Sequence, residues 1–271
     1  MKISVLIPAY HEQDKISQTI EMVQNTVKSL PFLTEIIVIC DGREDKTYEI
    51  ASTYNSHSVI ILGYSQNRGK GYALKYGFNH STGDLIIFFD AGLEFDPTHI
   101  VKIIDYYQKF KVPVIIGSKR HPESKVVYPA SRQFLSRAAQ LMVKTLFQMD
   151  IKDSQVGLKL FEREVLNEIF PKILVKQYAF DIEVLALAHH YGYKIMEIPV
   201  NLKMDFGHSS ICLSSINKSF WDTLAVFYRL KILQYYDHSS KDQPIAEHKP
   251  LLKKIPRIDF YIYFELKFKI K

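Results

Sequence analysis

Along the first 120 residues, short apolar runs alternate with longer segments in which apolar residues recur every three or four positions. Residues 3–7 form an apolar run that ends at Pro8, which is typical of a buried strand. Residues 14–30 have helical spacing, because Ile16, Ile20 and the apolar positions after them share one face. The same alternation predicts strands at 35–40, 58–62, 84–89 and 112–116 and helices at 45–54, 69–80 and 97–110.

The second half of the chain is less regular. Its pattern predicts helices at 131–147, 178–190 and 220–236, strands at 156–161 and 194–200, and a polar linker with two prolines at 237–250. The segment 220–236 is rich in large apolar residues. Two interpretations stay open for it: a core helix packed on the sheet, or an amphipathic helix in a membrane interface.

Strands that alternate with helices indicate βαβ units and a parallel sheet. We therefore predict an α/β fold with a mostly parallel central sheet flanked by helices. In such sheets the ligand binds beyond the carboxyl ends of the strands. Polar or charged groups follow each predicted strand, at residues 8–12, 41–45, 66–70, 90–96 and 117–120. This arrangement indicates a ligand site at one edge of the sheet.

Composition and charge narrow the function classes. With 47% hydrophobic and 24% charged residues, the 271-residue chain is too apolar to be largely disordered, and its two cysteines exclude a disulfide scaffold. The formal net charge is +6, but residues 249–271 contain seven basic and two acidic residues, which leaves +1 for the first 248. Nucleic-acid-binding domains usually carry their charge on the folded body, so we expect no nucleic-acid partner.

The basic residues of the C-terminal tail are interleaved with five aromatic residues. This mixture suits an anionic membrane surface, although a solvated tail explains it equally well. No apolar run reaches the ~18 residues of a membrane-spanning helix, and the N-terminal run is too short for a signal peptide. We therefore expect a cytoplasmic protein that is peripheral on the membrane surface.

Acidic residues at a strand end are the clearest chemical signal. The sequence lacks a Gly-rich phosphate loop, which argues against a dehydrogenase or an NTPase. Asp90 directly follows an apolar strand, and Glu94 and Asp96 come soon after. Carboxylates are ligands suited to Mg²⁺ or Mn²⁺, and such a metal neutralises a diphosphate leaving group. Asp96 directly precedes Pro97 and a helix, so helix capping explains it better.

Eight short motifs carry a resemblance to a known family. They lie at residues 4–12, 35–42, 67–73, 83–93, 117–120, 153–161, 180–183 and 197–200. In this order they resemble the inverting family 2 glycosyltransferases with the GT-A fold, and among these the polyprenyl-phosphate sugar synthases (dolichyl-phosphate glucose and mannose synthases). The resemblance covers roughly residues 3–210. We expect a GT-A domain over 1–212, an amphipathic helix over 213–236, and a linker with a helical, basic, aromatic tail over 237–271.

On the donor side, the resemblance implies a nucleotide site. Pro8, Tyr10 and Glu12 would contact the nucleotide, and Asp41 would hold its base. Lys70, in the motif Asn-Arg-Gly-Lys-Gly, is expected near the nucleotide, with simple packing or capping as the alternative.

The resemblance also implies a metal site and an acceptor site. Asp90 would bind the Mg²⁺ or Mn²⁺ that bridges the diphosphate, with Glu94 as a second carboxylate. Arg120 and Arg132 would receive the lipid phosphate, since an arginine fork suits a phosphate group. Asp181 is interpreted as a sugar-site or acceptor-site residue, or as a helix cap.

The chain departs from the family pattern at three places. Two aspartates are usual where this chain has Cys40-Asp41, Asp-x-Asp is usual where it has Asp90-Ala91-Gly92, and His11 replaces the usual Asn. Mg²⁺ needs only one or two carboxylates plus substrate phosphates, so a two-carboxylate site is still expected to bind metal.

The reaction implied by the resemblance is transfer of a sugar, with inversion, from a nucleotide sugar to a polyprenyl or dolichyl phosphate. Asp153-Ser154-Gln155 resembles the glucosyl branch, which favours a UDP-glucose-like donor over GDP-mannose. The acceptor phosphate is already ionised, so no strong base is needed. Two alternatives stay open: a catalytically inactive nucleotide-sugar-binding protein, suggested by Cys40 and Gly92, and a transferase that acts on a polysaccharide.

Overall fold

The computed structural model describes residues 1–124, 130–177, 179–202 and 213–238, and the side chains of 130–136, 138, 213–216 and 238 lie outside this description. The predicted basic, aromatic tail therefore lies almost entirely outside the described residues. The chain divides into two units, Met1–Gln234 and Tyr235–Lys271. The boundaries expected at residues 212 and 236 stay a prediction.

The elements of the described part follow the predicted order, with ends shifted by a few residues. The strands are β1 (Lys2–Ala9), β2 (Leu33–Asp41), β3 (Val59–Tyr64), β4 (Leu85–Phe89), β5 (Val114–Ser118), β6 (Leu158–Glu162) and β7 (Ile195–Pro199). The helices are α1 (Ile16–Lys28), α2 (Thr47–Ser52), α3 (Lys70–Asn79), α4 (Thr98–Phe110), α5 (Ala130–Phe147), α6 (Arg163–Ile169), α7 (Phe180–His190), α8 (Leu213–Phe227), the π-helix η1 (Tyr228–Ile232) and α9 (Tyr235–His238).

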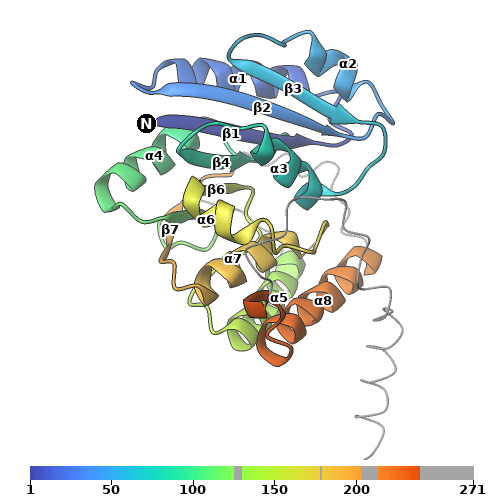
Figure 1. Cartoon of the computed structure of the whole chain (residues 1–271), viewed down its shortest axis with the longest axis vertical. Coiled ribbons are helices and arrows are strands. Elements are labelled where there is room, and N and C mark those ends of the chain that lie inside the picture. The colour runs from blue at the N-terminus through green and yellow to red at the C-terminus, as the bar shows by residue number, and fades with distance from the viewer. Residues whose placement is uncertain (125–129, 178, 203–212, 239–271) are drawn as a thin grey trace, which may run out of the picture. The chain divides into compact units, whose positions relative to one another are not determined.

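In the described residues the strands form one sheet in the order β3-β2-β1-β4-β6-β5-β7 (Figure 1). Every neighbouring pair is parallel except the two pairs that β6 makes with β4 and β5. The predicted α/β fold with a mostly parallel central sheet is thus confirmed. The sequence pattern did not predict that β6 runs antiparallel, nor the short helix α6.

The core is built by central strands and by single faces of helices. Every residue of β4 is buried, and the strand lies in the interior of the sheet between β1 and β6. Helix α1 buries Ile16, Ile20, Val23 and Val27, the stripe expected from its spacing, and packs on α4. Helix α3 packs on β1 and β2 and also on α7.

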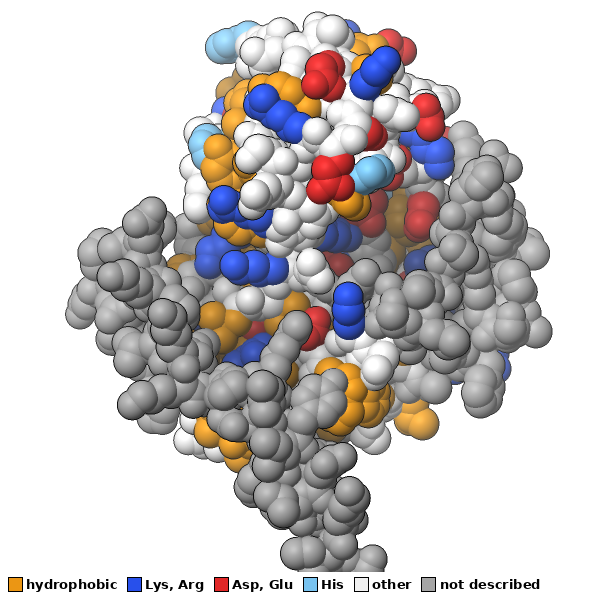
Figure 2. Space-filling view, turned by 90° about the vertical axis from the view of Figure 1, so that its right-hand side faces the viewer, with side chains coloured by type: hydrophobic (Ala, Val, Ile, Leu, Met, Phe, Trp, Pro, Cys, Tyr) orange, Lys and Arg blue, Asp and Glu red, His pale blue; other side chains and the backbone are white. Residues whose placement is uncertain are grey.

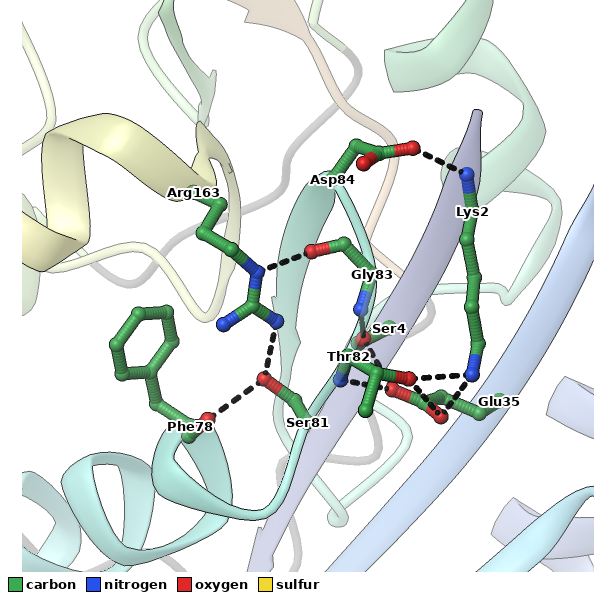
Figure 3. A network of polar contacts seen from close by, with 9 residues as sticks. All are labelled: Lys2, Ser4, Glu35, Phe78, Ser81, Thr82, Gly83, Asp84 and Arg163. Atoms are coloured by element: carbon green, nitrogen blue, oxygen red, sulfur yellow. Dashed lines mark hydrogen bonds and ion pairs between the residues drawn. The ribbon is translucent and has the colours of Figure 1, made fainter.

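A polar network joins the amino-terminal edge of the sheet (Figure 3). The Glu35 carboxylate accepts hydrogen bonds from the Ser4 hydroxyl at 2.6 Å and from the Thr82 backbone N–H at 2.6 Å, and its other oxygen lies 2.6 Å from Lys2 Nζ. Ser4 Oγ in turn accepts the Gly83 N–H, and Arg163 donates to the Gly83 carbonyl oxygen. This network ties β1, β2, β4 and α6 together.

Helices α5 and α8 pack together beside the sheet, and the Phe147 and Phe227 rings meet with centroids 6.2 Å apart. Helix α8 continues into η1, and the two bury a face that includes Val226 and Leu230. None of the helices in the described part of the chain combines the length and the apolar character needed to cross a bilayer.

Candidate active site

The carboxyl ends of the parallel strands bring most of the predicted residues to one edge. β1 begins on the left of Figure 1, so these ends lie on the right, which is the side that Figure 2 shows. Acidic and basic side chains gather across the middle of this face in Figure 2. The strand-end residues are Pro8, Tyr10 and Glu12 around the end of β1, Asp41 at the end of β2, Asp90 and Glu94 after β4, and Arg120 after β5. Lys70 begins α3, which follows β3.

Four charged side chains of alternating sign form a chain at this edge, which we call the Asp90–Lys159 charge chain. Lys70 Nζ lies 2.8 Å from Asp90 Oδ1 and 3.5 Å from Asp181 Oδ2. Lys159 Nζ lies 2.8 Å from Asp181 Oδ1 and also donates to the Val156 carbonyl oxygen. The four formal charges of this chain of side chains cancel one another.

The exposure of the side chains increases along the charge chain from Lys159 to Asp90. The Lys159 and Asp181 side chains are 1% and 11% exposed, whereas those of Lys70 and Asp90 are 29% and 32% exposed. Burial by itself raises the pKa of Asp181, but Lys159 and Lys70 outweigh it and lower that pKa. Asp181 therefore stays ionised and is a poor general base. It contacts two lysines of the charge chain, and its role as a sugar-site or acceptor-site residue stays a prediction.

The net pKa shifts of the two lysines have opposite signs, although burial acts in the same direction on both. Burial lowers the pKa of Lys159, and the attraction of Asp181 does not fully compensate. It also acts to lower the pKa of Lys70, but Asp181 and Asp90 together outweigh burial and raise that pKa. Lys70 is thus a stably protonated side chain in contact with Asp90, and its expected role near the nucleotide stays a prediction.

Two glycines place Lys70 in this position. Gly69 has φ +92°, and a Cβ there would lie 2.3 Å from the Lys176 carbonyl oxygen. A Cβ on Gly71 would lie 2.4 Å from the Phe180 ring, and the Gly71 N–H donates to the Lys176 oxygen at 2.9 Å. The motif therefore needs glycine on both sides of the lysine, so that the start of α3 can pack against residues 176–180.

Asp90 is held just as closely from another strand. A Cβ on Gly157, the residue before β6, would lie 2.2 Å from Asp90 Oδ2. The antiparallel direction of β6 brings this glycine to the ligand edge. As a result one Asp90 oxygen binds Lys70, and the other faces the backbone of Gly157.

A buried carboxylate fixes the segment that supports the start of α3. Glu183, which is fully buried in α7, accepts the backbone N–H groups of Leu174 and Val175 at 3.1 and 2.7 Å. Its other oxygen lies 3.4 Å from a guanidinium nitrogen of Arg229 in η1. Glu183 thereby connects the helical C-terminal part of the described fold to the site.

On the donor side, Asp41 organises the loop before α3. Its two buried oxygens accept the backbone N–H groups of Arg68 at 2.7 Å and Gly69 at 2.9 Å. Tyr10 is half exposed, and its hydroxyl donates to Glu44 at 2.9 Å. The expected contacts of Pro8, Tyr10, Glu12 and Asp41 with a nucleotide stay predictions.

Cys40, which stands where the family usually has an aspartate, is buried on the opposite side of β2 from Asp41. Burial raises the pKa of its thiol to about 12, so the thiol stays protonated and unreactive at neutral pH. The Cys40 side chain lies beside Gly63 of β3, because a Cβ added to Gly63 would be 3.5 Å from the Cys40 Cβ. The substitution changes the core and not the ligand-facing surface.

The carboxylates near Asp90 suit a divalent cation that shares its ligands with a substrate. Among the described residues no three His, Cys, Asp or Glu side chains form a complete metal site. Glu12 is partly buried, and burial together with the nearby charges of Asp90, Asp45 and Glu94 raises its pKa. A cation would relieve this repulsion. The donors present fit a metal held by Asp90 and a second carboxylate, with the remaining ligands supplied by phosphate oxygens.

The residues predicted to receive the acceptor lie near the segments after β5 and before β6. Asp153 accepts the backbone N–H of Lys119 at 3.0 Å, and Glu197 of β7 accepts the N–H groups of Lys152 and Asp153 at 2.8 and 3.0 Å. Arg120, next to Lys119, is half-buried at this end. Arg132 falls in α5, and its side chain lies outside the described residues.

Sequence reasoning missed Lys159 and Glu183. Both lie in predicted apolar elements, where a charged residue is usually taken as the exposed position of an amphipathic pattern. The sequence does hold one signal for them, since each is flanked by apolar residues. A charged side chain in such surroundings is buried and needs a partner of opposite charge or a hydrogen bond.

The family model for "Glycosyl transferase family 2" matches residues 4–170. The chain belongs to this family. The match covers β1 through α6, the part that carries Asp90, Lys70 and Lys159.

Curated relatives extend the match. The chain is 35% identical to a dolichyl-phosphate beta-glucosyltransferase of Dictyostelium discoideum over 214 residues, which is 73% of this chain and 65% of that protein. It is 30% identical to a dolichyl-phosphate beta-glucosyltransferase of Trichomonas vaginalis over 260 residues, which is 89% of this chain and 75% of the relative. The chain thus spans just under two thirds of the Dictyostelium protein.

Solved structures share the fold at low identity. Mannosyl-3-phosphoglycerate synthase from Rubrobacter xylanophilus superposes with a TM-score of 0.66 at 16% identity, covering 87% of this chain and 76% of that one. Glucosyl-3-phosphoglycerate synthase from Mycobacterium tuberculosis, in complex with Mn²⁺, UDP and phosphoglyceric acid, gives 0.66 at 17% identity, covering 84% and 77%. These neighbours support the GT-A assignment of the fold.

Proposed function

We propose that this family 2 glycosyltransferase transfers a sugar, with inversion, from a UDP-glucose-like donor to a polyprenyl or dolichyl phosphate. The observation that carries the proposal is the state of Asp181. This carboxylate lies beside the strand-end site, but two lysines bind its oxygens and lower its pKa, which makes it a weak proton acceptor. A site arranged this way suits an acceptor that arrives already ionised, such as a phosphate, better than a sugar hydroxyl that must lose a proton.

In the reaction, an oxygen of the acceptor phosphate attacks the anomeric carbon of the donor sugar. The bond from that carbon to the diphosphate oxygen breaks, and the nucleoside diphosphate leaves with the bonding electrons. Lys70 provides a cation beside the developing charge on the diphosphate. Arg120, and Arg132 from the sequence resemblance, would receive the acceptor phosphate.

A divalent cation, Mg²⁺ or Mn²⁺, would be held by Asp90 with Glu94 or Glu12 and would neutralise the diphosphate. Support comes from the repulsion that Asp90 and Glu94 exert on the Glu12 carboxylate, and from the Mn²⁺ and UDP bound by the Mycobacterium synthase. The glucosyl preference rests on the names of the two curated relatives.

The test is a panel of labelled UDP-glucose, GDP-mannose and other nucleotide sugars, each incubated with a polyprenyl phosphate and Mg²⁺ or Mn²⁺. The proposal expects label in an organic-extractable lipid phosphate, with UDP-glucose the best donor. Label in a polysaccharide instead would favour the other acceptor class. Tight binding of UDP without any transfer would favour the inactive-binder alternative.

The lipid acceptor implies a membrane surface as partner. Large apolar side chains are exposed on α5, α8 and η1, among them Leu141 (64%), Phe220 (42%) and Ile232 (61%). We expect these exposed apolar side chains and the basic residues of the tail to bind anionic vesicles. Leu33, the first residue of β2, is also apolar and is 75% exposed, but β2 lies far from α5 and α8 in Figure 1, so Leu33 serves as a matched control.

Vesicle sedimentation compares the full chain, a chain that ends at residue 248, Ile232→Glu and Leu33→Glu. Loss of the tail and the Ile232 change should each weaken binding, and the tail's contribution should fall as salt rises, since charges are screened over ~8 Å at physiological ionic strength. Equal binding by all four proteins would contradict the membrane assignment.

A further inference from the structure

The position of Lys70 on Asp90 conflicts with metal binding in a way that is open to test. Lys70 Nζ lies 2.8 Å from Asp90 Oδ1, and the other Asp90 oxygen faces the backbone of Gly157. A cation that approaches Asp90 therefore meets an ammonium group already in contact with it. Two positive charges a few ångströms apart in a half-buried site repel each other, so the two cations compete.

Asp181 offers Lys70 a second position. Its Oδ2 is 3.5 Å from Lys70 Nζ, so a small movement of the side chain moves the ammonium from one carboxylate to the other. Asp181 already holds Lys159 through its other oxygen. Lys70 therefore keeps a counter-charge when it leaves Asp90, which makes the movement electrostatically feasible.

We propose that Lys70 is a built-in competitor for the divalent cation, which occupies Asp90 until metal and nucleotide diphosphate arrive together and then shifts toward Asp181. This inference rests on the metal–nucleotide site of the proposed function. The negative diphosphate offsets the repulsion between Lys70 and the metal, so the metal binds well only with nucleotide. Lys70 is in this sense a positioning residue that makes metal binding conditional on the donor.

Mn²⁺ binding, measured from the electron paramagnetic resonance signal of the free ion, tests this without any turnover. The wild-type chain should bind Mn²⁺ weakly alone and much more tightly with UDP. Lys70→Met should tighten binding of Mn²⁺ alone by about tenfold or more, because the competing charge is gone. In this variant UDP should increase the affinity for Mn²⁺ by a smaller factor than in the wild-type chain. Lys75→Met, which changes a half-buried lysine on the same helix, is the matched control and should leave both affinities unchanged.

A second variant gives an independent result with Lys70 still present. Asp181→Asn removes the second position of Lys70, so Lys70 should hold Asp90 more firmly and Mn²⁺ should bind more weakly, with UDP as well as without it. Circular dichroism confirms that each variant is folded.

Each outcome separates the two proposals. Wild-type chain that does not bind Mn²⁺ even with UDP would overturn the proposed metal–nucleotide site and this inference with it. Tight Mn²⁺ binding with UDP, but unchanged binding of Mn²⁺ alone in Lys70→Met, would overturn only the role of Lys70. Opposite shifts in Lys70→Met and Asp181→Asn would support it.

Discussion

Both edges of the central sheet carry buried ion pairs, but the pairs are completed in different ways. At the amino-terminal edge Glu35 binds Lys2, the Ser4 hydroxyl and the Thr82 N–H, so its oxygens are occupied from several elements (Figure 3). At the carboxyl-terminal edge Asp90 is a third exposed and binds Lys70, which is itself divided between two carboxylates.

The same residue types thus serve two purposes. The Glu35 network has little left to offer a ligand, and its contacts join segments that are far apart in the sequence. In the Asp90–Lys159 charge chain, the Lys159–Asp181 ion pair is buried. Lys70 and Asp90 are partly exposed, so their ion pair can exchange with a ligand. We conclude that the first cluster contributes mainly stability and the second mainly chemistry, and substitutions should separate the two.

The largest effect is expected for Asp90→Asn. A neutral amide is a much poorer ligand for a hard cation and a weaker partner for Lys70, so transfer should fall by about 100-fold or more. The unfolding temperature should change little, because Asp90 is partly exposed and Asp181 still neutralises Lys70. Label transfer and a thermal melt measure the two effects, and unchanged turnover would contradict the assignment of Asp90.

Glu35→Gln should show the reverse pattern. The Glu35 side chain is 7% exposed, and its replacement weakens the bonds from Lys2, Ser4 and Thr82. The free energy of unfolding should fall by about 2 kcal/mol. The affinity for UDP should stay the same, since this edge is opposite the site. A clear loss of UDP affinity in the folded variant would mean that the two edges are coupled.

The difference between wild type and Glu35→Gln should also depend on pH. Burial by itself raises the pKa of Glu35, but hydrogen bonds from Lys2, Ser4 and Thr82 outweigh it and lower the pKa. A carboxyl with a lowered pKa in the folded state contributes stability above its unfolded pKa of about 4.3, and that contribution is lost as the pH falls below it. Urea unfolding from pH 7 to pH 3 should therefore show the two proteins converging in stability.

The smallest effect is expected for Gly92→Asp, which restores the usual second aspartate. Gly92 does not have a positive φ, and a Cβ there meets only Glu12 Oε1, at 3.5 Å, so the backbone accepts the change. An added carboxylate should tighten Mn²⁺ binding by roughly threefold to tenfold in the presence of UDP. Unchanged affinity would mean that position 92 does not face the metal.

The parallel half of the fold was predictable because its signals are local. Alternating apolar runs and helical stripes identified β1 to β4 and their helices, and the strand-end rule placed Asp41 and Asp90 at one edge. Strand direction leaves no mark in the local pattern, so the antiparallel course of β6 was missed. For the same reason the contact between Lys159 and Asp181, 22 residues apart, became visible only in the folded chain.

The reversed direction of β6 also bears on how the site forms in time. β4 pairs with β6, so residues 85–89 must find residues 158–162 across more than 65 intervening residues. Such distant pairings form slowly, because the intervening chain must first lose conformational freedom. Strands β1, β2 and β3 pair with one another across much shorter stretches of chain and should fold first, whereas the β1–β4 pairing is as distant as that of β4 with β6. The backbone of Gly157 therefore reaches Asp90 only in a later step of folding. We expect the chain to become able to bind its ligand after most of the secondary structure has formed.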